Sequence, residues 1–323
     1  MIDIFGTLGP ACDSEDTLYA MLCAGMTGVR LNLSHEMLSE AEGSLNRLHA
    51  AADRAGRAPK LLIDLQGPEL RVGVLPQPLP LAEGKRVRLG EDIPLPPAVA
   101  AQLVPDQTLL LDDGKLLLRV EEGLTARVER GGVLSSRKSV ALPGLELRLP
   151  ALTDDDRENL ALAAALGVTG VMQPFVRSRE DLISVRQALR DAGGEQIRIY
   201  AKIENQQGMA ALPSLLDAAD EIVIARGDLG NAMPLYALPA AQKTISGVCR
   251  EAGTPFMVVT QMLASMERSP VPTRAEVSDI FNAVLDGAAS VMVTGETAIG
   301  AHPVEAIRWL AQTAAEAEKF RNI

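Results

Sequence analysis

Short apolar runs alternate with helix-like segments along most of this chain, and this alternation limits the possible folds more than any other feature. Eight runs are typical of buried strands, at residues 2–5, 28–33, 60–64, 170–173, 197–203, 221–225, 256–260 and 290–294. Helical spacing of apolar residues separates them, as at residues 13–24, 34–52, 153–166, 178–192, 240–252, 273–285 and 303–317. Strands that alternate with helices form a parallel sheet covered by helices, so we expect an α/β fold.

One segment, residues 72–147, interrupts this alternation. It begins with closely spaced prolines and continues with short alternating runs at residues 86–89, 108–111, 115–120 and 124–130. Turn-forming residues separate the runs at 112–114 and 130–132. We interpret residues 72–147 as a small all-β lid domain inserted after the third strand of a larger domain made of residues 1–71 and 148–323.

Two α/β architectures compete for the larger domain. Without the insert about 250 residues remain, the usual size of a (β/α)8 barrel. A doubly wound open sheet is the alternative, but no Gly-x-Gly-x-x-Gly motif follows the first strand. The count of eight strands therefore favours a TIM barrel. Aromatic residues make up only 3% of the chain, so Leu, Ala, Val and Ile must form most of its core.

Charge and cysteine content exclude several classes of protein. The formal net charge of −11 argues against a general nucleic-acid binder, although a few local cations could still hold a phosphorylated small molecule. The three cysteines show neither disulfide nor zinc spacing, which favours a reducing compartment. A basic leader and an apolar run approaching 18 residues are both absent. We expect a cytoplasmic protein without a membrane span.

Polar residues recur where the predicted strands end. In a (β/α)8 barrel, the carboxyl ends of all strands meet at one rim, and that rim carries the active site. Any one of these residues could simply cap a helix or form a rim salt bridge, but the whole set is harder to explain in that way. The residues at these ends are Arg30, Asn32, Asp64, Lys202, Glu204, Arg226, Asp228, Thr260, Thr294 and Glu296.

These residue types suit a particular chemistry. Glu204 and Asp228 offer hard oxygen ligands, and Mg²⁺ is usually held by one or two carboxylates together with substrate oxygens. Arg30 and Lys202 are cations that could neutralise a phosphate at the same rim. Phosphoryl transfer depends mainly on positioning and charge stabilisation. The sequence therefore predicts a metal-assisted site for an anionic, phosphorylated acid.

The same residues lie in segments that resemble the pyruvate kinase family over most of the chain. The resemblance extends to the insert, at residues 112–114 and 142–144, which is similar to the family's mobile lid domain. Residues 273–285 resemble the family's subunit contact, which implies a homodimer. The matching barrel segments are residues 7–11, 28–35, 64–71, 201–205, 225–230, 260–266, 272–276, 282–287 and 294–298.

The resemblance implies catalytic and substrate-binding roles. Lys202 would stabilise the transferring phosphoryl group, and Arg30 would contact phosphate. The N–H groups of Gly227 and Asp228, together with Thr260, would hold the carboxylate of phosphoenolpyruvate or pyruvate. Thr260 would also lie near the proton-transfer step. The implied reaction converts phosphoenolpyruvate and ADP to pyruvate and ATP.

The resemblance also implies metal and nucleotide sites. Glu204 and Asp228 would bind Mg²⁺ or Mn²⁺. The residues expected to bind K⁺ are Asn32, Ser34, Asp64 and the carbonyl group of Leu65. The residues expected to face the nucleotide are Arg71, Asn32 and His35.

Several positions depart from the family pattern. Asp155 replaces a lysine that would meet ADP phosphates, and Gln66 replaces a lysine common in K⁺-dependent members. The K⁺ pattern is mixed, because Glu69 resembles K⁺-dependent members whereas Leu65, Gln66 and Val72 resemble K⁺-independent ones. The family's C-terminal regulatory domain is expected to be absent, since the sequence stops just after the eighth helix.

Three functional hypotheses follow. The first is a Mg²⁺-dependent pyruvate kinase-like phosphotransferase that uses ADP. The second is a related enzyme on the same site, with a different phosphoryl acceptor or with lyase or decarboxylase activity on oxoacids, and Asp155 and Gln66 motivate it. The third is a sensor that binds phosphoenolpyruvate without catalysis. The presence of both Lys202 and Thr260 argues against it, because a protein that only binds the ligand does not need these two residues. The sequence leaves the acceptor, the K⁺ dependence and the oligomeric state open.

Overall fold

The computed structural model describes residues 2–68, 70–112, 114–145 and 149–321. The chain divides into two compact units, which are described separately. The barrel unit comprises Met1–Gly67, Ala151–Leu229 and Ala237–Ile323, and the β unit comprises Pro68–Pro150 and Gly230–Tyr236. The edges expected for the insert, residues 72 and 147, therefore lie slightly inside the β unit. One reason is that the backbone of residues 70–72 pairs with residues 137–140.

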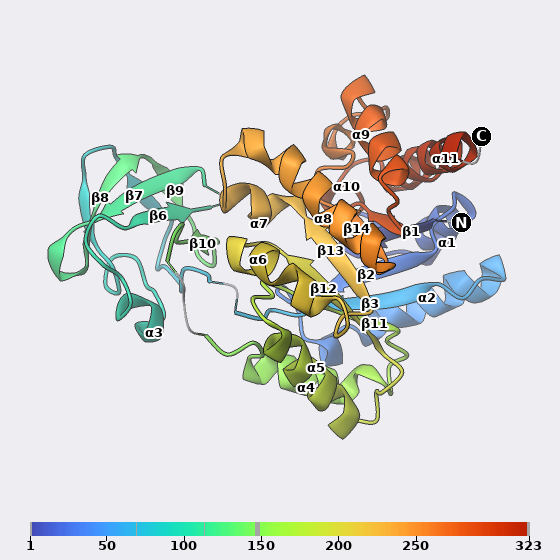
Figure 1. Cartoon of the computed structure of the whole chain (residues 1–323), viewed down its shortest axis with the longest axis horizontal. Helices are drawn as coiled ribbons and strands as arrows, with labels where there is room; N and C mark the ends of the chain where they lie inside the picture. Colours follow the sequence, from blue (N-terminus) through green and yellow to red (C-terminus); the bar gives the residue numbers. More distant parts are fainter. Residues whose placement is uncertain (1, 69, 113, 146–148, 322–323) are drawn as a thin grey trace. The chain divides into compact units, whose positions relative to one another are not determined.

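The barrel unit is built on a closed barrel of eight parallel strands (Figure 1). This confirms the predicted (β/α)8 barrel, and the strands of the β unit follow its third strand in the sequence. Around the barrel the strand order is β1 (Asp3–Thr7), β15 (Ser290–Met292), β14 (Phe256–Val259), β13 (Glu221–Ala225), β12 (Arg198–Ile203), β11 (Gly170–Gln173), β3 (Lys60–Asp64) and β2 (Gly28–Asn32).

The barrel strands are buried because helices cover their outer face and side chains fill the interior. Every residue of β13 and β14 is buried. Since aromatic residues are scarce, methionine and aliphatic side chains occupy much of the interior. One buried cluster combines side chains from most of the strands: Phe5, Leu62, Met172, Tyr200, Val223, Ala225, Met257, Val259 and Met292.

Side-chain caps start several helices of the barrel unit. Ser14, Thr153, Asn205 and Thr273 accept hydrogen bonds from N–H groups in the first turns of α1 (Glu15–Cys23), α4 (Asp154–Ala163), α6 (Gln206–Leu215) and α9 (Arg274–Leu285). These caps satisfy N–H groups that have no partner within the helix. The remaining helices are α2 (Glu42–Ala55), α5 (Arg179–Asp191), α7 (Arg226–Asn231), α8 (Leu238–Ala252), α10 (Gly295–Ala298) and α11 (Pro303–Arg321).

One expected helix begins later than the sequence indicated. The spacing predicted a helix over residues 34–52, but α2 starts at Glu42 after a 3-10 turn at Leu38–Glu40. The backbone N–H groups that precede α2 are bound elsewhere. The Ser34 N–H donates to Asn32 Oδ1 at 3.3 Å, and the Leu38 N–H donates to Asn159 Oδ1 at 2.8 Å. Residues 34–37 therefore belong to the loop at the strand end rather than to the helix.

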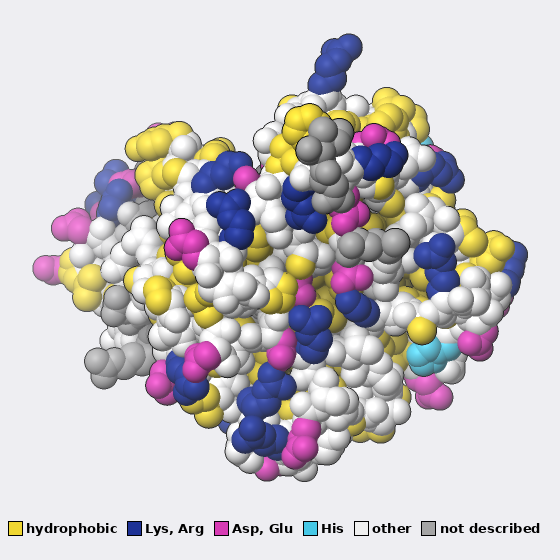
Figure 2. All heavy atoms as spheres, turned by 45° about the vertical axis from the view of Figure 1, so that its right-hand side comes forward, with side chains coloured by type: hydrophobic (Ala, Val, Ile, Leu, Met, Phe, Trp, Pro, Cys, Tyr) yellow, Lys and Arg dark blue, Asp and Glu magenta, His cyan; other side chains and the backbone are white. Residues whose placement is uncertain are grey.

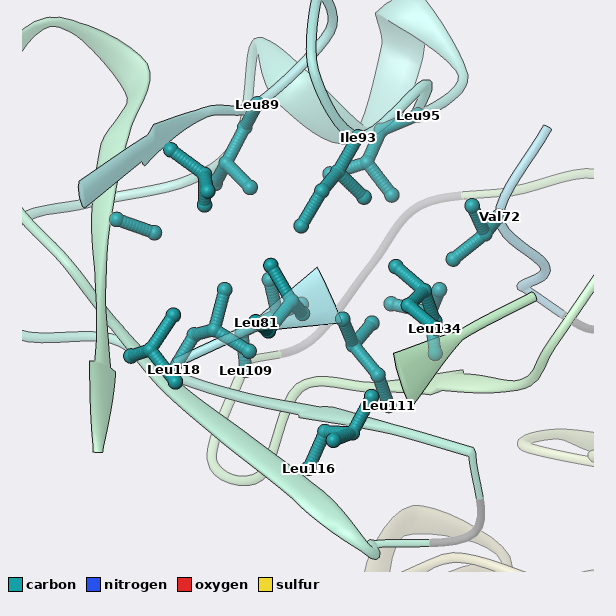
Figure 3. Close-up of a cluster of buried hydrophobic side chains, with 14 of the residues drawn as sticks. Val72, Leu81, Leu89, Ile93, Leu95, Leu109, Leu111, Leu116, Leu118 and Leu134 are labelled. Atoms are coloured by element: carbon teal, nitrogen blue, oxygen red, sulfur yellow. The ribbon is translucent and has the colours of Figure 1, made fainter. Parts of the chain in front are cut away.

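The β unit has its own hydrophobic core, to which its strands contribute alternate side chains (Figure 3). The leucines Leu109, Leu111, Leu116 and Leu118 from the β6–β7 hairpin are buried in it. A one-turn helix, α3 (Pro97–Ala100), means that the unit is not purely β. Its five-stranded antiparallel sheet has the order β10 (Val140–Ala141), β6 (Thr108–Leu111), β7 (Leu116–Val120), β8 (Thr125–Arg130) and β5 (Arg86–Arg88), and β4 (Leu79–Leu81) pairs with β9 (Gly132–Leu134).

The distribution of surface charge and the hydrophobicity of the helices bear on whether the chain could bind nucleic acid or cross a membrane. Figure 2 shows Lys and Arg side chains interspersed with Asp and Glu side chains over the face that it draws. That face therefore carries mixed charge and differs from the clustered basic patch that is typical of nucleic-acid binders. Among the residues that the structure describes, every helix is too short or too polar to cross a bilayer.

The three cysteines are expected to differ sharply in reactivity. Cys23 is exposed, whereas Cys12 and Cys249 are buried. Burial raises the pKa of Cys12 to about 11 and that of Cys249 to about 12, so both remain thiols at pH 8. Because the thiolate is the reactive form, a disulfide reagent should modify one thiol per folded chain and three after unfolding. Rapid modification of Cys249 in the folded protein, located by peptide mapping, would contradict this expectation.

Candidate active site

Most of the candidate site residues of the barrel unit lie at or just beyond the carboxyl ends of barrel strands. Arg30 and Asn32 belong to β2, Asp64 ends β3, and Lys202 is the penultimate residue of β12. Asn32 and Asp64 are direct partners in the parallel register of β2 and β3. Strand ends of the same polarity meet at one rim, which explains how residues far apart in the sequence are brought together.

Four charged side chains at this rim form a connected cluster. Arg30 Nε donates to Asp64 Oδ2 at 2.8 Å, and Arg30 Nη2 lies 2.7 Å from the same oxygen. Lys202 Nζ lies 3.2 Å from Asp64 Oδ2 and 3.0 Å from Glu204 Oε1. The side chains of Asp64 and Glu204 are only 3% and 1% exposed, whereas those of Arg30 and Lys202 are 14% and 13% exposed. The two cations thus keep partial access to a ligand, and the two buried carboxylates pair with them.

The cluster controls the protonation of its members. Burial by itself would lower the pKa of Lys202, but the adjacent carboxylates of Asp64 and Glu204 outweigh burial and raise it. Lys202 is therefore a permanent cation at neutral pH. Burial raises the pKa of Glu204 to about 7, with Asp228 and Asp64 adding to the increase and Lys202 opposing it. The positive charge of Lys202 thus favours the ionised form of Glu204, whereas burial favours the protonated form.

Glu204 is held in place by a backbone group that the sequence did not reveal. The Phe175 N–H donates to Glu204 Oε2 at 2.8 Å. Phe175 adopts φ = 50°, in the left-handed region that non-glycine residues seldom enter. A positive φ is usually found at glycine. A phenylalanine at this position therefore gives no sign, in the sequence, of the conformation that aims its N–H group at Glu204.

Gly227, Asp228 and Thr260 lie together at the next strand ends. Helix α7 begins at Arg226, directly after β13, so Gly227 and Asp228 fall in its first turn. A Cβ atom on Gly227 would lie 3.1 Å from Thr260 Cγ2 and 3.7 Å from Thr260 Oγ1. The absence of a side chain at Gly227 therefore lets Thr260 approach this turn closely.

The residues expected to bind Mg²⁺ provide suitable ligand chemistry. The carboxylate of Asp228 is close enough to Glu204 to raise the pKa of Glu204 by charge repulsion. Two hard oxygen ligands fit Mg²⁺, which commonly completes its coordination with substrate oxygens and water. In the described ranges, the structure contains no group of three or more His, Cys, Asp or Glu side chains arranged to hold a metal. The donor set therefore fits a magnesium ion bound jointly by protein and substrate.

The residues expected to bind K⁺ come from the loops after β2 and β3. Asn32 Oδ1 accepts the Ser34 N–H at 3.3 Å, and the Asp64 carbonyl accepts the Leu33 N–H at 3.0 Å. Leu65 is buried, and its N–H donates to the Met172 carbonyl at 3.1 Å. The structure thus brings the segments 32–34 and 64–65 together. Glu69 lies outside the described residues.

The residues expected to face the nucleotide fall in different units. Asn32 and His35 belong to the barrel unit, where His35 is exposed and its N–H donates to the Asn32 carbonyl at 3.3 Å. Arg71 belongs to the β unit, where its Nη1 donates to the Arg137 carbonyl at 2.9 Å. Asn32 and His35 are thus near each other in the barrel unit, whereas Arg71 is described only within the β unit.

The start of α4 has two distinct functions that the sequence did not separate. The exposed Asp155 Oδ2 accepts a hydrogen bond from Gln66 Nε2 at 3.4 Å, so the two departures from the family pattern contact each other. Asp156, by contrast, is fully buried. Its oxygens accept the backbone N–H groups of Gln66, Gly67 and Thr153 at 2.8, 2.9 and 2.9 Å. Asp156 therefore fixes the loop after β3 in addition to capping α4, a role that a run of three aspartates in the sequence does not indicate.

Glu296, one of the polar residues after β15, has a structural role. Glu296 is buried, and its carboxylate accepts the N–H groups of Leu263 and Thr294 at 3.0 and 2.7 Å. Glu296 thus fixes the loops after β14 and β15. It is a structural residue of the rim, in agreement with the simpler interpretation of such groups.

A family model and several curated relatives that match this chain all carry the name pyruvate kinase. A family model described as "Pyruvate kinase, barrel domain" matches residues 1–307. A pyruvate kinase of Geobacillus stearothermophilus is 37% identical over 97% of this chain, which spans 56% of that protein. A pyruvate kinase of Aeropyrum pernix is 39% identical over 98% of the chain, which spans 71% of it. One of Clostridium acetobutylicum is 36% identical over 98% of the chain, which spans 70% of it.

Proposed function

Because the chain belongs to the pyruvate kinase family, we propose that it transfers the phosphoryl group of phosphoenolpyruvate to ADP, forming pyruvate and ATP. The observation that carries the proposal is the buried cluster of Arg30, Asp64, Lys202 and Glu204 at the strand ends. In this reaction the bond between phosphorus and the enol oxygen breaks. A bond forms from phosphorus to a β-phosphate oxygen of ADP, and C3 of the three-carbon unit takes up a proton.

Different residues of this chain contribute to charge stabilisation, to substrate binding and to proton transfer. Lys202 and Arg30 place positive charge where the phosphoryl group leaves, and fixed charges of this kind lower the barrier without reorganising. The backbone N–H groups of Gly227 and Asp228, with the hydroxyl group of Thr260, bind the carboxylate of the substrate. Thr260 lies at the side where the proton is delivered. The same carboxylates, Asp64 and Glu204, keep the two cations oriented.

We propose Mg²⁺, or Mn²⁺ in its place, as the cofactor, held by Glu204 and Asp228. When bound, the ion supplies positive charge beside the oxygens of the phosphoryl group and of the acid. For K⁺ we propose Asn32, Ser34, Asp64 and the Leu65 carbonyl as ligands. Arg71, Asn32 and His35 are the proposed contacts of the nucleotide.

Substrates of this kind are small and diffusible, and we propose a cytoplasmic enzyme that assembles as a homodimer. The proposed subunit contact includes residues 273–285, on and around α9.

The direct test supplies purified protein with phosphoenolpyruvate, ADP and Mg²⁺, with and without K⁺, and follows pyruvate and ATP separately. We expect equal amounts of both products and loss of turnover when a chelator removes the divalent metal. If no pyruvate forms while Mg²⁺ and oxalate still bind together by calorimetry, the proposal is wrong in this form.

The hydrogen bond between Gln66 and Asp155 favours a second candidate. An anionic Asp155 would repel ADP phosphates, so an acceptor with less negative charge, or an oxoacid that undergoes cleavage or decarboxylation, is the alternative. Pyruvate formation with ADP alone would weaken this candidate. Turnover of another acceptor or of an oxoacid, in a screen without ADP, would support it.

Reversing the charge at Asp155 tests whether this residue faces the phosphoryl acceptor. If ADP is the acceptor, Asp155→Lys should lower the KM for ADP by about tenfold, because a repulsive charge becomes attractive. Asp154→Lys is the matched control, since Asp154 is an exposed residue in the same first turn of α4. Equal effects of both substitutions on the KM for ADP would show that Asp155 does not face the acceptor.

A further inference from the structure

Two successive residues after β14 adopt left-handed backbone conformations. Thr260 has φ = 78° and Gln261 has φ = 54°. For a β-branched residue such as threonine this conformation is unfavourable, and it persists only where surrounding contacts impose it. Thr260 is also one of the proposed substrate-binding residues. The contacts that impose its conformation therefore bear on the reaction.

Arg226 makes those contacts. Its Nε and Nη2 atoms both donate to the Thr260 carbonyl oxygen, at 3.1 and 2.8 Å. Nη2 also lies 3.0 Å from Met262 Sδ, just beyond the second strained residue. The guanidinium group thus contacts the backbone within the left-handed segment and the side chain of the residue that follows it. Two parallel N–H groups aimed at one carbonyl oxygen fix its direction, which a single lysine ammonium cannot do in the same way.

Asp279 holds the opposite edge of the guanidinium group. Arg226 Nη1 donates to Asp279 Oδ1 at 2.8 Å and to Oδ2 at 2.6 Å. The Gln242 side-chain oxygen lies 3.5 Å from the same nitrogen. The Arg226 side chain is only 11% exposed, so solvent screens these contacts weakly. Asp279 belongs to α9 and Arg226 begins α7, so the contact joins a helix of the outer layer to the strand-end loop.

We propose that Arg226, anchored by Asp279, is a positioning residue that holds Thr260 in its left-handed conformation and keeps its side chain beside Gly227. The 3.1 Å approach of Thr260 Cγ2 to the Cβ position of Gly227 depends on this conformation. A negative φ at Thr260 would turn the side chain away from the carboxylate-binding segment. The consequence for turnover rests on the proposed function, whereas the conformational part does not.

The first experiment measures conformation. Crystal structures of the unaltered protein, Arg226→Lys and Asp279→Asn are compared with Arg268→Lys, an exposed arginine in the same loop region. We expect φ of Thr260 to stay positive in the unaltered protein and in Arg268→Lys, and to become negative in Arg226→Lys. Asp279→Asn is the milder variant if Arg226→Lys does not fold. A Thr260 that remains left-handed in both variants overturns the proposal, whatever their activity.

The second experiment measures the reaction and the ligand. For Arg226→Lys we expect kcat to fall 10- to 100-fold with the KM for ADP changed less than twofold, because a small misplacement of a reacting group costs rate rather than remote binding. A purely structural role would lower thermal stability without this separation of kcat from KM. A changed φ with unchanged kcat overturns the positioning role.

The failure of the proposed function has a different signature. If the unaltered protein does not turn over phosphoenolpyruvate, the calorimetric affinity for oxalate with Mg²⁺ replaces kcat as the measurement. We then expect at least tenfold weaker oxalate binding in Arg226→Lys than in Arg268→Lys. Equal affinities in the two variants overturn the positioning role.

Discussion

The variant Lys202→Met is expected to lose about three orders of magnitude in kcat, the size of effect seen when one fixed group that stabilises transition-state charge is removed. The side chain keeps its length and loses its charge. Of the two side-chain cations proposed to contact phosphoenolpyruvate, only the guanidinium group of Arg30 would remain, and Asp64 already partly neutralises it.

The same substitution should also change the protonation of its neighbours. Lys202 Nζ contacts both Asp64 and Glu204, and it opposes the raised pKa of Glu204. Without it, the carboxyl group of Glu204 should bind a proton more readily. Removing one partner of a buried ion pair costs about 3–5 kcal/mol, so the free energy of unfolding should decrease too.

Activity and folding can be separated with two further variants. Lys202→Arg keeps the charge and most of the stability, but it places the charge differently, so its kcat should also be low. Lys243→Met is the matched control, because Lys243 is an exposed lysine paired with Asp286 on the outer helices. Steady-state kinetics and thermal unfolding are measured for all three. Retention of more than a tenth of kcat in folded Lys202→Met would refute the assigned role.

The variant Asp156→Ala is expected to destabilise the protein by about 3–4 kcal/mol. Three backbone N–H groups, from Gln66, Gly67 and Thr153, would lose their common acceptor, the fully buried Asp156 carboxylate. A buried donor left without a partner costs about 1–3 kcal/mol, and contacts to a charged acceptor lie at the upper end. Asp156 also joins the loop after β3 to the start of α4, so that loop should loosen first.

Asp154→Ala provides the control for Asp156→Ala. Asp154 lies in the same first turn but is exposed, so its removal costs only its interaction with the helix dipole, about 0.3–1 kcal/mol. Denaturant unfolding of both variants gives the comparison. Asp156→Asn keeps one acceptor oxygen and should lie between the two. A loss below 1 kcal/mol for Asp156→Ala would mean that the loop finds other partners for its N–H groups.

Much of the barrel could be predicted because it depends on local signals. Fully apolar strands and amphipathic helices carry periodicities that are visible in any window of the sequence. The rim position of Arg30, Asp64, Lys202 and Glu204 followed from one further rule, that parallel strands end on the same side. The late start of α2 did not follow, because Asn159, more than a hundred residues away, binds the Leu38 N–H that a longer helix would have used.

The alternation of strands and helices, the family, and the charged residues at the strand ends were thus predictable from the order of the amino acids. How those side chains are held follows from contacts that form only in the folded chain. Phe175 and Thr260 adopt left-handed conformations that their residue types disfavour, and Asp156 and Arg226 bind backbone groups from distant segments. Local propensity cannot reveal such arrangements, because contacts between segments that meet only after folding provide the free energy that maintains them.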